Sequence, residues 1–236
     1  MKNKIILGDC YELIKAIPDH SVDLIYTDIP YEFHSGGGGL RVKRAATYSE
    51  VEKMNQGIDY AILDEFVRVM KKIYIYIWCS KDQMLPIMDY FINKKGCLFL
   101  PKVWCKTNPT PFTNNTFLSD LEYCLVFREK GTKLNDGIKL KSRYYISAKN
   151  VLDKADYHHP CCKPLELVER DILHSSQPGD LILDPFAGSG TTCLAAKHLG
   201  RSYIGFEVDP TFHKIAVDRL NGIDANGVMN LFDCGD

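Results

Sequence analysis

The chain has 236 residues, 45% of them hydrophobic, and its formal net charge at pH 7 is −1. This length and composition fit one α/β domain with a buried core, and no apolar run has the length of a signal peptide or a membrane helix, so we expect a cytoplasmic protein with no membrane association. A net charge of −1 excludes a general electrostatic attraction to nucleic acid, so nucleic-acid binding would need a local basic patch.

The N-terminal part of the chain is predicted to contain two buried strands, each followed by an aspartate. Residues 5–7 form the first strand, which runs into Gly8-Asp9-Cys10. Residues 22–27 form the second, which ends in Asp28-Ile29-Pro30-Tyr31. Ligands of open α/β sheets bind beyond the strand ends, and here the aspartate offers an acceptor while the tyrosine offers a ring face. This corner suits a flat group that carries an NH2, although an ordinary loop with a capping aspartate would show the same pattern.

Residues 33–44 follow this corner and contain four consecutive glycines and three basic side chains. Such a segment is too flexible for a regular element, so we expect a mobile loop whose basic end contacts phosphates. A solvated loop with no partner is the alternative.

The middle of the chain supplies scaffold and a basic segment. Its expected elements are a helix at 62–70, a strand at 73–78, a helix at 82–93, and two strands at 98–104 and 121–127 that form a terminal hairpin.

From residue 102 to residue 163 there are eleven basic side chains and six acidic ones. This segment contains basic side chains next to aromatic ones, at Lys139, Lys141, Arg143, Tyr144 and Tyr145. We expect target recognition there, although a run of charge is more often a solvated face.

A second candidate site is Asp184-Pro185-Phe186-Ala187-Gly188-Ser189-Gly190-Thr191-Thr192, which follows a short apolar strand at 180–183 and precedes a helix at 191–199. Glycines let the backbone pass close to a ligand, and the helix start offers free amide donors. The next strand, 202–206, ends in Glu207, which is placed to accept hydrogen bonds from both hydroxyls of a ribose. The pattern indicates a bound nucleoside.

Three other interpretations of this turn compete with a nucleoside site. A nucleotide-triphosphate P-loop is excluded because Gly190 is followed by Thr191 and Thr192 rather than by Lys-Ser/Thr. A dinucleotide site requires a third glycine at the position of Cys193, so the cysteine counts against that interpretation. A tight strand-to-helix turn with no ligand stays open, and the Asp-Pro-Phe run counts against it.

Together, the two segments resemble the Asp-Pro-Pro-Tyr and Phe-x-Gly-x-Gly motifs of the S-adenosylmethionine-dependent amino-methyltransferases of DNA, which methylate adenine N6 or cytosine N4. The catalytic segment precedes the cofactor segment, which is the permuted order of the beta class. Three further segments resemble this family: Gly8-Asp9-Cys10, Trp104-Cys105-Lys106-Thr107-Asn108-Pro109 and His159-Pro160-Cys161-Cys162-Lys163-Pro164-Leu165. The resemblance spans about residues 4 to 221.

The resemblance implies an α/β, Rossmann-like methyltransferase fold with a seven-stranded, mostly parallel sheet, one antiparallel strand and a circularly permuted motif order. It implies a single methyltransferase domain over 1–221, recognition insertions near 33–57 and 106–158, and a C-terminal tail over 222–236. The implied cofactor is S-adenosylmethionine and the implied partner is double-stranded DNA, while a homodimer and a restriction endonuclease partner stay open.

The resemblance also assigns roles to residues. The expected catalytic residues are Asp28, Ile29, Pro30 and Tyr31. The expected cofactor-binding residues are Asp9, Cys10, Asp28, Phe186, Gly188, Ser189, Gly190, Thr191 and Glu207, with Lys163 as a further candidate. Asp28 and the carbonyl of Ile29 would accept the two N–H hydrogens of an adenine N6 amine, and Tyr31 would stack on the base after it has flipped out of the duplex.

Two residues depart from the family pattern. Ile29 stands where proline is usual, which costs roughly 0.4 to 1 kcal/mol of preorganisation, and Cys161 replaces a threonine. Cytosine N4 is the nearest alternative acceptor, RNA or a protein amide is a more distant one, and a non-catalytic cofactor-holding or DNA-binding subunit is the alternative from another class. No metal is expected, because the adjacent Cys161 and Cys162 give poor tetrahedral geometry beside His158 and His159.

Overall fold

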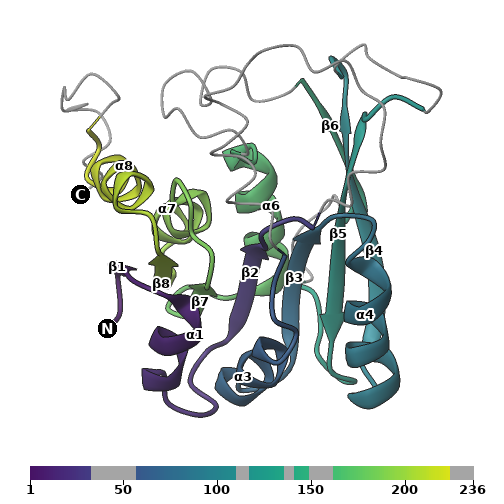
Figure 1. The fold of residues 1–236 in the computed structure, drawn as a ribbon, viewed down its shortest axis with the longest axis horizontal. Helices are drawn as coiled ribbons and strands as arrows, with labels where there is room; N and C mark the ends of the chain where they lie inside the picture. The colour runs from purple at the N-terminus through teal and green to yellow at the C-terminus, as the bar shows by residue number, and fades with distance from the viewer. Residues whose placement is uncertain (33–56, 110–116, 136–140, 149–161, 224–236) are drawn as a thin grey trace.

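The computed structural model describes residues 1–32, 57–109, 117–135, 141–148 and 162–223. In these residues a central sheet carries helices on both of its faces (Figure 1). The loop expected at 33–44 and the tail beyond residue 223 lie outside the described residues, as do parts of the insertion expected at 106–158.

The sheet has eight strands in the order β1-β8-β7-β2-β3-β5-β4-β6. Their bounds, in chain order, are β1 Lys4–Leu7, β2 Leu24–Asp28, β3 Tyr74–Cys79, β4 Leu98–Lys106, β5 Leu121–Arg128, β6 Tyr144–Ser147, β7 Leu181–Asp184 and β8 Ser202–Glu207. Strand β5 runs antiparallel to both of its neighbours, β3 and β4, and all other neighbouring strands are parallel. The expected mostly parallel sheet with one reversed strand is confirmed.

The sheet contains one strand more than the seven expected. Strand β6 pairs with β4 alone and alternates between exposed and half-buried residues, so its four residues show no apolar run that would mark a buried strand. The strands expected as a hairpin do pair, but β4 is not terminal, because β6 covers its outer side.

Two groups of helices cover the sheet. One face carries α1 (Cys10–Leu13), the 3-10 helix η1 (Ile14–Ala16), α3 (Ile62–Val69), α4 (Met84–Met88) and the π-helix η2 (Asp89–Lys94). The other face carries α6 (Leu165–Ser175), α7 (Thr191–His198) and α8 (Pro210–Leu220). The helix expected at 82–93 is therefore divided into an α-helical and a π-helical part.

The core lies on both sides of the central strands. All six residues of β3 are buried, because helices cover both faces of a largely parallel sheet at this position. In α3 the buried residues Ile62, Phe66 and Val69 recur at helical spacing and face the sheet. This rigid double-sided core fixes where each strand ends, and so where the loops of the site begin.

Candidate active site

The two candidate segments meet at one edge of the sheet. Strand β2 ends at Asp28 and its neighbour β7 ends at Asp184, and the two strands are parallel, so both loops leave the same edge. From β2 the chain continues to β3 on one side, and from β7 it continues to β8 on the other. Such a reversal of direction opens a crevice in which α/β proteins bind ligands.

The loop after β2 is held by hydrogen bonds from the neighbouring strand and the loop behind it. The N–H of Ile29 donates to the carbonyl oxygen of Trp78 at 3.2 Å, and the carbonyl oxygen of Pro30 accepts from Nε2 of Gln83 at 2.8 Å. Ile29 is 1% exposed and packs in the core, and Gln83 is fully buried. Core packing of Ile29 therefore supplies rigidity that the family's usual proline would supply by its ring.

Lys163 lies against the loop after β2 and not on the glycine turn. Its ammonium donates to Oδ2 of Asp28 and lies 3.3 Å from the hydroxyl of Tyr31. On its other side, the Lys163 ammonium is 2.9 Å from Oε2 of Glu122. The other oxygen of Asp28, Oδ1, is buried and accepts no hydrogen bond from any residue that the structure describes.

Burial and charge act against each other in this cluster. Burial raises the pKa of Asp28, while the Lys163 ammonium opposes that rise. Burial would also raise the pKa of Glu122, but Lys163 and Lys106 outweigh it and hold the pKa at about 2. Lys163 loses solvation on burial, yet Asp28 and Glu122 raise its pKa well above the ordinary value. Lys163 and Glu122 are therefore charged at neutral pH.

The glycine turn after β7 needs its glycines for backbone shape and for packing. Gly188 and Gly190 have φ of 51° and 79°, in the left-handed region that other residues rarely adopt. A Cβ on Gly190 would lie 3.0 Å from Cβ of Ala216 and 3.1 Å from Cδ1 of Ile5. Gly190 therefore lets α8 and β1 pack close to the turn.

Two hydroxyl residues of the turn, Ser189 and Thr191, face the protein interior. Oγ of Ser189 lies 2.7 Å from Sγ of Cys162, and Oγ1 of Thr191 accepts from the guanidinium of Arg219 at 2.8 Å. Arg219 also donates to the carbonyl oxygen of Ser189 at 3.3 Å, and all four residues are buried. These two side chains hold the turn in place. The backbone of the turn is therefore the part that can contact a ligand. Phe186 is partly buried and packs on the core beside them.

Glu207 lies next to the glycine turn with its carboxylate held by two backbone amides. Oε2 accepts from the N–H of Gly188 at 2.8 Å, and Oε1 accepts from the N–H of Asp209 at 2.8 Å. A carboxylate oxygen has two acceptor sites, so each oxygen keeps one. An oriented carboxylate with spare acceptor capacity fits the hydroxyls of a ribose, so these residues fit a nucleoside cofactor.

Asp9 and Cys10 lie at the neighbouring strand end. Strands β1 and β8 are parallel, with Leu7 opposite Glu207. Asp9 is exposed and caps α1 by accepting from the N–H of Tyr11 at 2.9 Å. Cys10 is buried, and burial raises the pKa of its thiol to about 12. The structure thus brings Asp9, Cys10, Glu207 and the glycine turn to adjacent strand ends.

Comparison with known proteins agrees with this geometry. The profile of the DNA methylase family matches residues 22–218. The type II methyltransferase M2.DpnII of Streptococcus pneumoniae is 30% identical over 250 residues, which cover 93% of this chain and 90% of the relative. The type II methyltransferase M.HinfI of Haemophilus influenzae is 31% identical over 250 residues, covering 95% and 70%. The crystal structure of the M1.HpyAVI–SAM complex has a TM-score of 0.70 and 26% identity, covering 92% and 98%.

The fold and the site define a Rossmann-like methyltransferase with a permuted motif order. The chain belongs to the DNA methylase family, as an S-adenosylmethionine-dependent DNA methyltransferase of the N6/N4 class.

The sequence did not predict several residues of the site. Glu122, Gln83 and Arg219 are polar or charged and lie at 20%, 0% and 6% exposure. Only Glu122 gave a signal, as an acidic residue near the start of a largely apolar strand, and this signal does not say what the side chain contacts. Among the described residues no helix is long and apolar enough to cross a membrane, and no group of three or more His, Cys, Asp or Glu is arranged to hold a metal.

Proposed function

We propose that this methyltransferase acts on the exocyclic N6 amine of an adenine that has flipped out of duplex DNA. The observation that carries the proposal is the buried Oδ1 of Asp28. This oxygen accepts no hydrogen bond within the described residues, and Asp28 lies at the crevice in the sheet. An unpaired buried acceptor is costly, so it is expected where a ligand supplies the donor.

The chemistry follows from the poor nucleophilicity of an aromatic amine, whose lone pair is shared with the ring. S-adenosylmethionine, when bound, supplies an electrophilic methyl group. Oδ1 of Asp28 would accept one N–H of the amine, with the carbonyl of Ile29 as the proposed acceptor of the second, which leaves the nitrogen lone pair to react. The carboxylate would also stabilise the positive charge that develops on the amine, and it can take up the proton that the amine loses.

The remaining site residues are proposed to position the two ligands. Tyr31 is half-buried beside Asp28 and offers a ring for stacking on the base, which is worth roughly 1 to 3 kcal/mol. The carboxylate of Glu207 would hold the ribose, and the turn from Phe186 to Thr191 would pass beneath the cofactor. Asp9 and Cys10 would lie at its adenine, at the end of β1.

Strands β4, β5 and β6 extend beyond the level at which β2 ends. Asp28 is level with Trp78, Cys124 and Lys102, whereas β4 continues to Lys106, which is roughly 13 Å further at the usual rise per residue. These strands therefore form a wall beside the crevice (Figure 1). We propose that this wall contributes to target recognition, as part of one methyltransferase domain.

The test is methyl incorporation into duplex DNA, followed by mass spectrometry of the nucleosides. We expect N6-methyladenine from the wild type, and we expect Asp28→Asn to lower kcat by about a thousandfold, because the amide removes both the charge and one acceptor oxygen. Binding of S-adenosylmethionine to the variant, measured by calorimetry, should stay within a few fold of wild type.

The products decide between the alternatives. N4-methylcytosine in place of N6-methyladenine would reassign the acceptor while keeping the role of Asp28. A wild type that binds the cofactor and transfers no methyl to any duplex would contradict the proposal, and faster transfer to RNA than to DNA would overturn the substrate class.

A further inference from the structure

Four charged side chains of alternating sign form a continuous chain beside the crevice. Asp28 bonds to Lys163, the Lys163 ammonium is 2.9 Å from Oε2 of Glu122, and the Lys106 ammonium is 2.6 Å from Oε1 of Glu122. They come from β2, from the segment before α6, from β5 and from β4. The exposed fraction of each side chain is low, from 6% for Lys163 to 25% for Asp28.

The Lys163 ammonium is held in place from several sides. Its nitrogen lies 5.2 Å from the ring centroid of Trp78 and 5.6 Å from that of Tyr31, so both ring faces also favour a cation there. The indole N–H of Trp78 donates to the hydroxyl of Tyr26 at 2.9 Å, which fixes the orientation of the indole. The ammonium therefore occupies a built position between two carboxylates.

Glu122 changes what Lys163 does to Asp28. A lone Lys–Asp pair has no net charge, and it would weaken the field that Asp28 must exert on a developing cation. With Glu122 on the far side of the same ammonium, one cation is shared by two carboxylates and the three groups carry a net charge of −1. Lys106 lies beyond Glu122 and balances it at a greater distance from the reacting amine.

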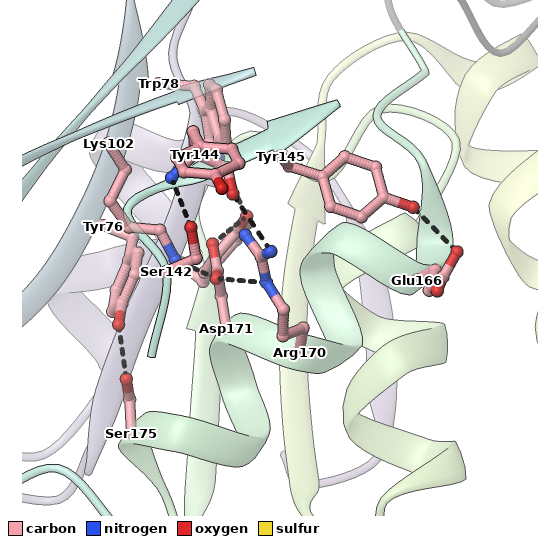
Figure 2. A network of polar contacts seen from close by, with 11 residues as sticks. Tyr76, Trp78, Lys102, Ser142, Tyr144, Tyr145, Glu166, Arg170, Asp171 and Ser175 are labelled. Atoms are coloured by element: carbon pink, nitrogen blue, oxygen red, sulfur yellow. Dashed lines mark hydrogen bonds and ion pairs between the residues drawn. The ribbon is translucent and has the colours of Figure 1, made fainter. Parts of the chain in front are cut away.

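A second buried ion pair in the protein shows a different arrangement. Lys102 bonds to Oδ1 of Asp171 (Figure 2). Oδ2 of Asp171 accepts from the hydroxyl of Tyr26 at 3.4 Å. Both oxygens of Asp171 are thus used by the protein, as expected of a pair that only supports the fold. At Asp28 only Oδ2 is used within the described residues, and Oδ1 is left available.

We propose that Glu122 is a positioning residue for methyl transfer, which holds the Lys163 ammonium between two carboxylates so that this cation neutralises Asp28 only in part and Oδ1 stays open to the amine. This inference rests on the proposed function, since it assigns Asp28 as the acceptor of the amine N–H. Glu122 acts through Lys163 and touches neither substrate nor cofactor.

The proposal predicts opposite pH shifts for two variants. The groups that act on Asp28 are Lys163, Glu122 and Tyr31, together with Asp184 of β7 across the crevice and Cys79 at the end of the neighbouring strand β3. The pKa of Asp28 is raised by burial, lowered by Lys163 and raised by Glu122. Since Asp28 works ionised, the acidic limb of activity follows its pKa. Glu122→Gln should therefore move that limb to lower pH, and Lys163→Gln should move it to higher pH.

The experiment is the pH profile of kcat and kcat/KM for methyl transfer to duplex DNA. For Glu122→Gln we also expect the plateau of kcat to fall by about tenfold, because the ammonium then neutralises Asp28 more fully. Glu122→Asp keeps the charge and should restore the limb toward the wild-type position. Glu65→Gln, which removes an ion pair with Arg68 in α3 at 2.7 Å, is the matched control and should leave the profile unchanged.

Each outcome decides the inference. Two results with an active wild type would overturn the role of Glu122 and leave the proposed function intact. In the first, the acidic limb of Glu122→Gln coincides with that of the wild type. In the second, the limb shifts in the same direction in Glu122→Gln and in Lys163→Gln. A wild type that transfers no methyl to DNA overturns both. Where Glu122→Gln does not fold, Lys106→Gln replaces it. That change frees Glu122 to draw the ammonium away from Asp28, so the limb must move to higher pH.

Discussion

At the scale of single residues, the site depends on groups whose oxygens are held in fixed directions. Glu207 is the clearest case, because two backbone N–H groups donate to its two oxygens. An amide has only one acceptor oxygen, so replacing the carboxylate would leave one of these N–H groups without its partner. Replacing the Glu207 carboxylate by an amide therefore removes both its charge and its fixed orientation.

Glu207→Gln should raise the dissociation constant for S-adenosylmethionine by about tenfold or more, because a charged acceptor for the ribose hydroxyls is lost. Isothermal titration calorimetry measures this directly. The thermal melting temperature reports whether the fold survives. An unchanged dissociation constant in a folded variant would remove Glu207 from the cofactor site.

A second prediction concerns Gly190. Gly190→Ala forces a side chain into φ of 79° and places a Cβ 3.0 Å from Ala216, so we expect the free energy of unfolding to fall by about 1 to 3 kcal/mol. Gly200→Ala is the matched control, because Gly200 has φ of 71° and no atom within 4 Å of a Cβ. Urea denaturation of both variants separates strain from packing, and equal losses would show that packing contributes nothing.

At the scale of elements, the edge strand β6 extends the wall beside the crevice. Tyr144 and Ile146 are 57% and 59% exposed and lie two residues apart, so they point to the same side of the strand. Between them, Tyr145 is turned the other way, and its hydroxyl donates to Glu166 of α6 at 2.7 Å (Figure 2). One side of β6 thus anchors the strand, and the other side is presented to solvent.

Tyr144→Ala should raise the KM for duplex DNA by about tenfold while leaving the affinity for S-adenosylmethionine unchanged, since one stacking contact is worth roughly 1 to 3 kcal/mol. Tyr145→Phe is the control, because it removes only the hydrogen bond to Glu166. Steady-state kinetics with a single duplex substrate distinguishes them. If both variants bind DNA as the wild type does, recognition lies elsewhere.

At the scale of the whole molecule, the sheet places a buried acid under the site. Asp184 ends β7 and is 3% exposed, and burial raises its pKa from 3.8 to about 7, although the backbone N–H of Phe186 donates to Oδ1 at 3.2 Å and opposes the rise. A carboxyl that binds its proton more tightly in the folded state stabilises the fold below pH 3.8. That contribution is lost as the pH rises toward about 7.

Asp184→Asn removes this titration. Between pH 4 and about pH 7, the unfolding free energy of the variant should therefore increase relative to that of the wild type. The slope of this difference should reach up to about 1.4 kcal/mol per pH unit. Urea denaturation at several pH values measures it, and a difference that is flat across this range would mean that Asp184 is ionised in the folded state throughout.

Local patterns were enough to predict much of this protein. Apolar runs placed β1, β2, β3, β7 and β8, and the residues that follow them placed the candidate site residues, because a strand end and a glycine turn are properties of neighbouring residues. The order of the two motifs also predicted a permuted methyltransferase, and the reversed strand that the fold implied is β5.

Only the tertiary structure decided which distant groups meet. Lys163 was a candidate for the cofactor site, yet it lies on Asp28, 135 positions away along the chain. Glu122 entered the site because β5 pairs with β3, and β6 was found only by its pairing with β4. The physical reason is that a charge is stabilised by whichever opposite charge shares its buried volume, and that volume is set by how the sheet is assembled rather than by the residues on either side.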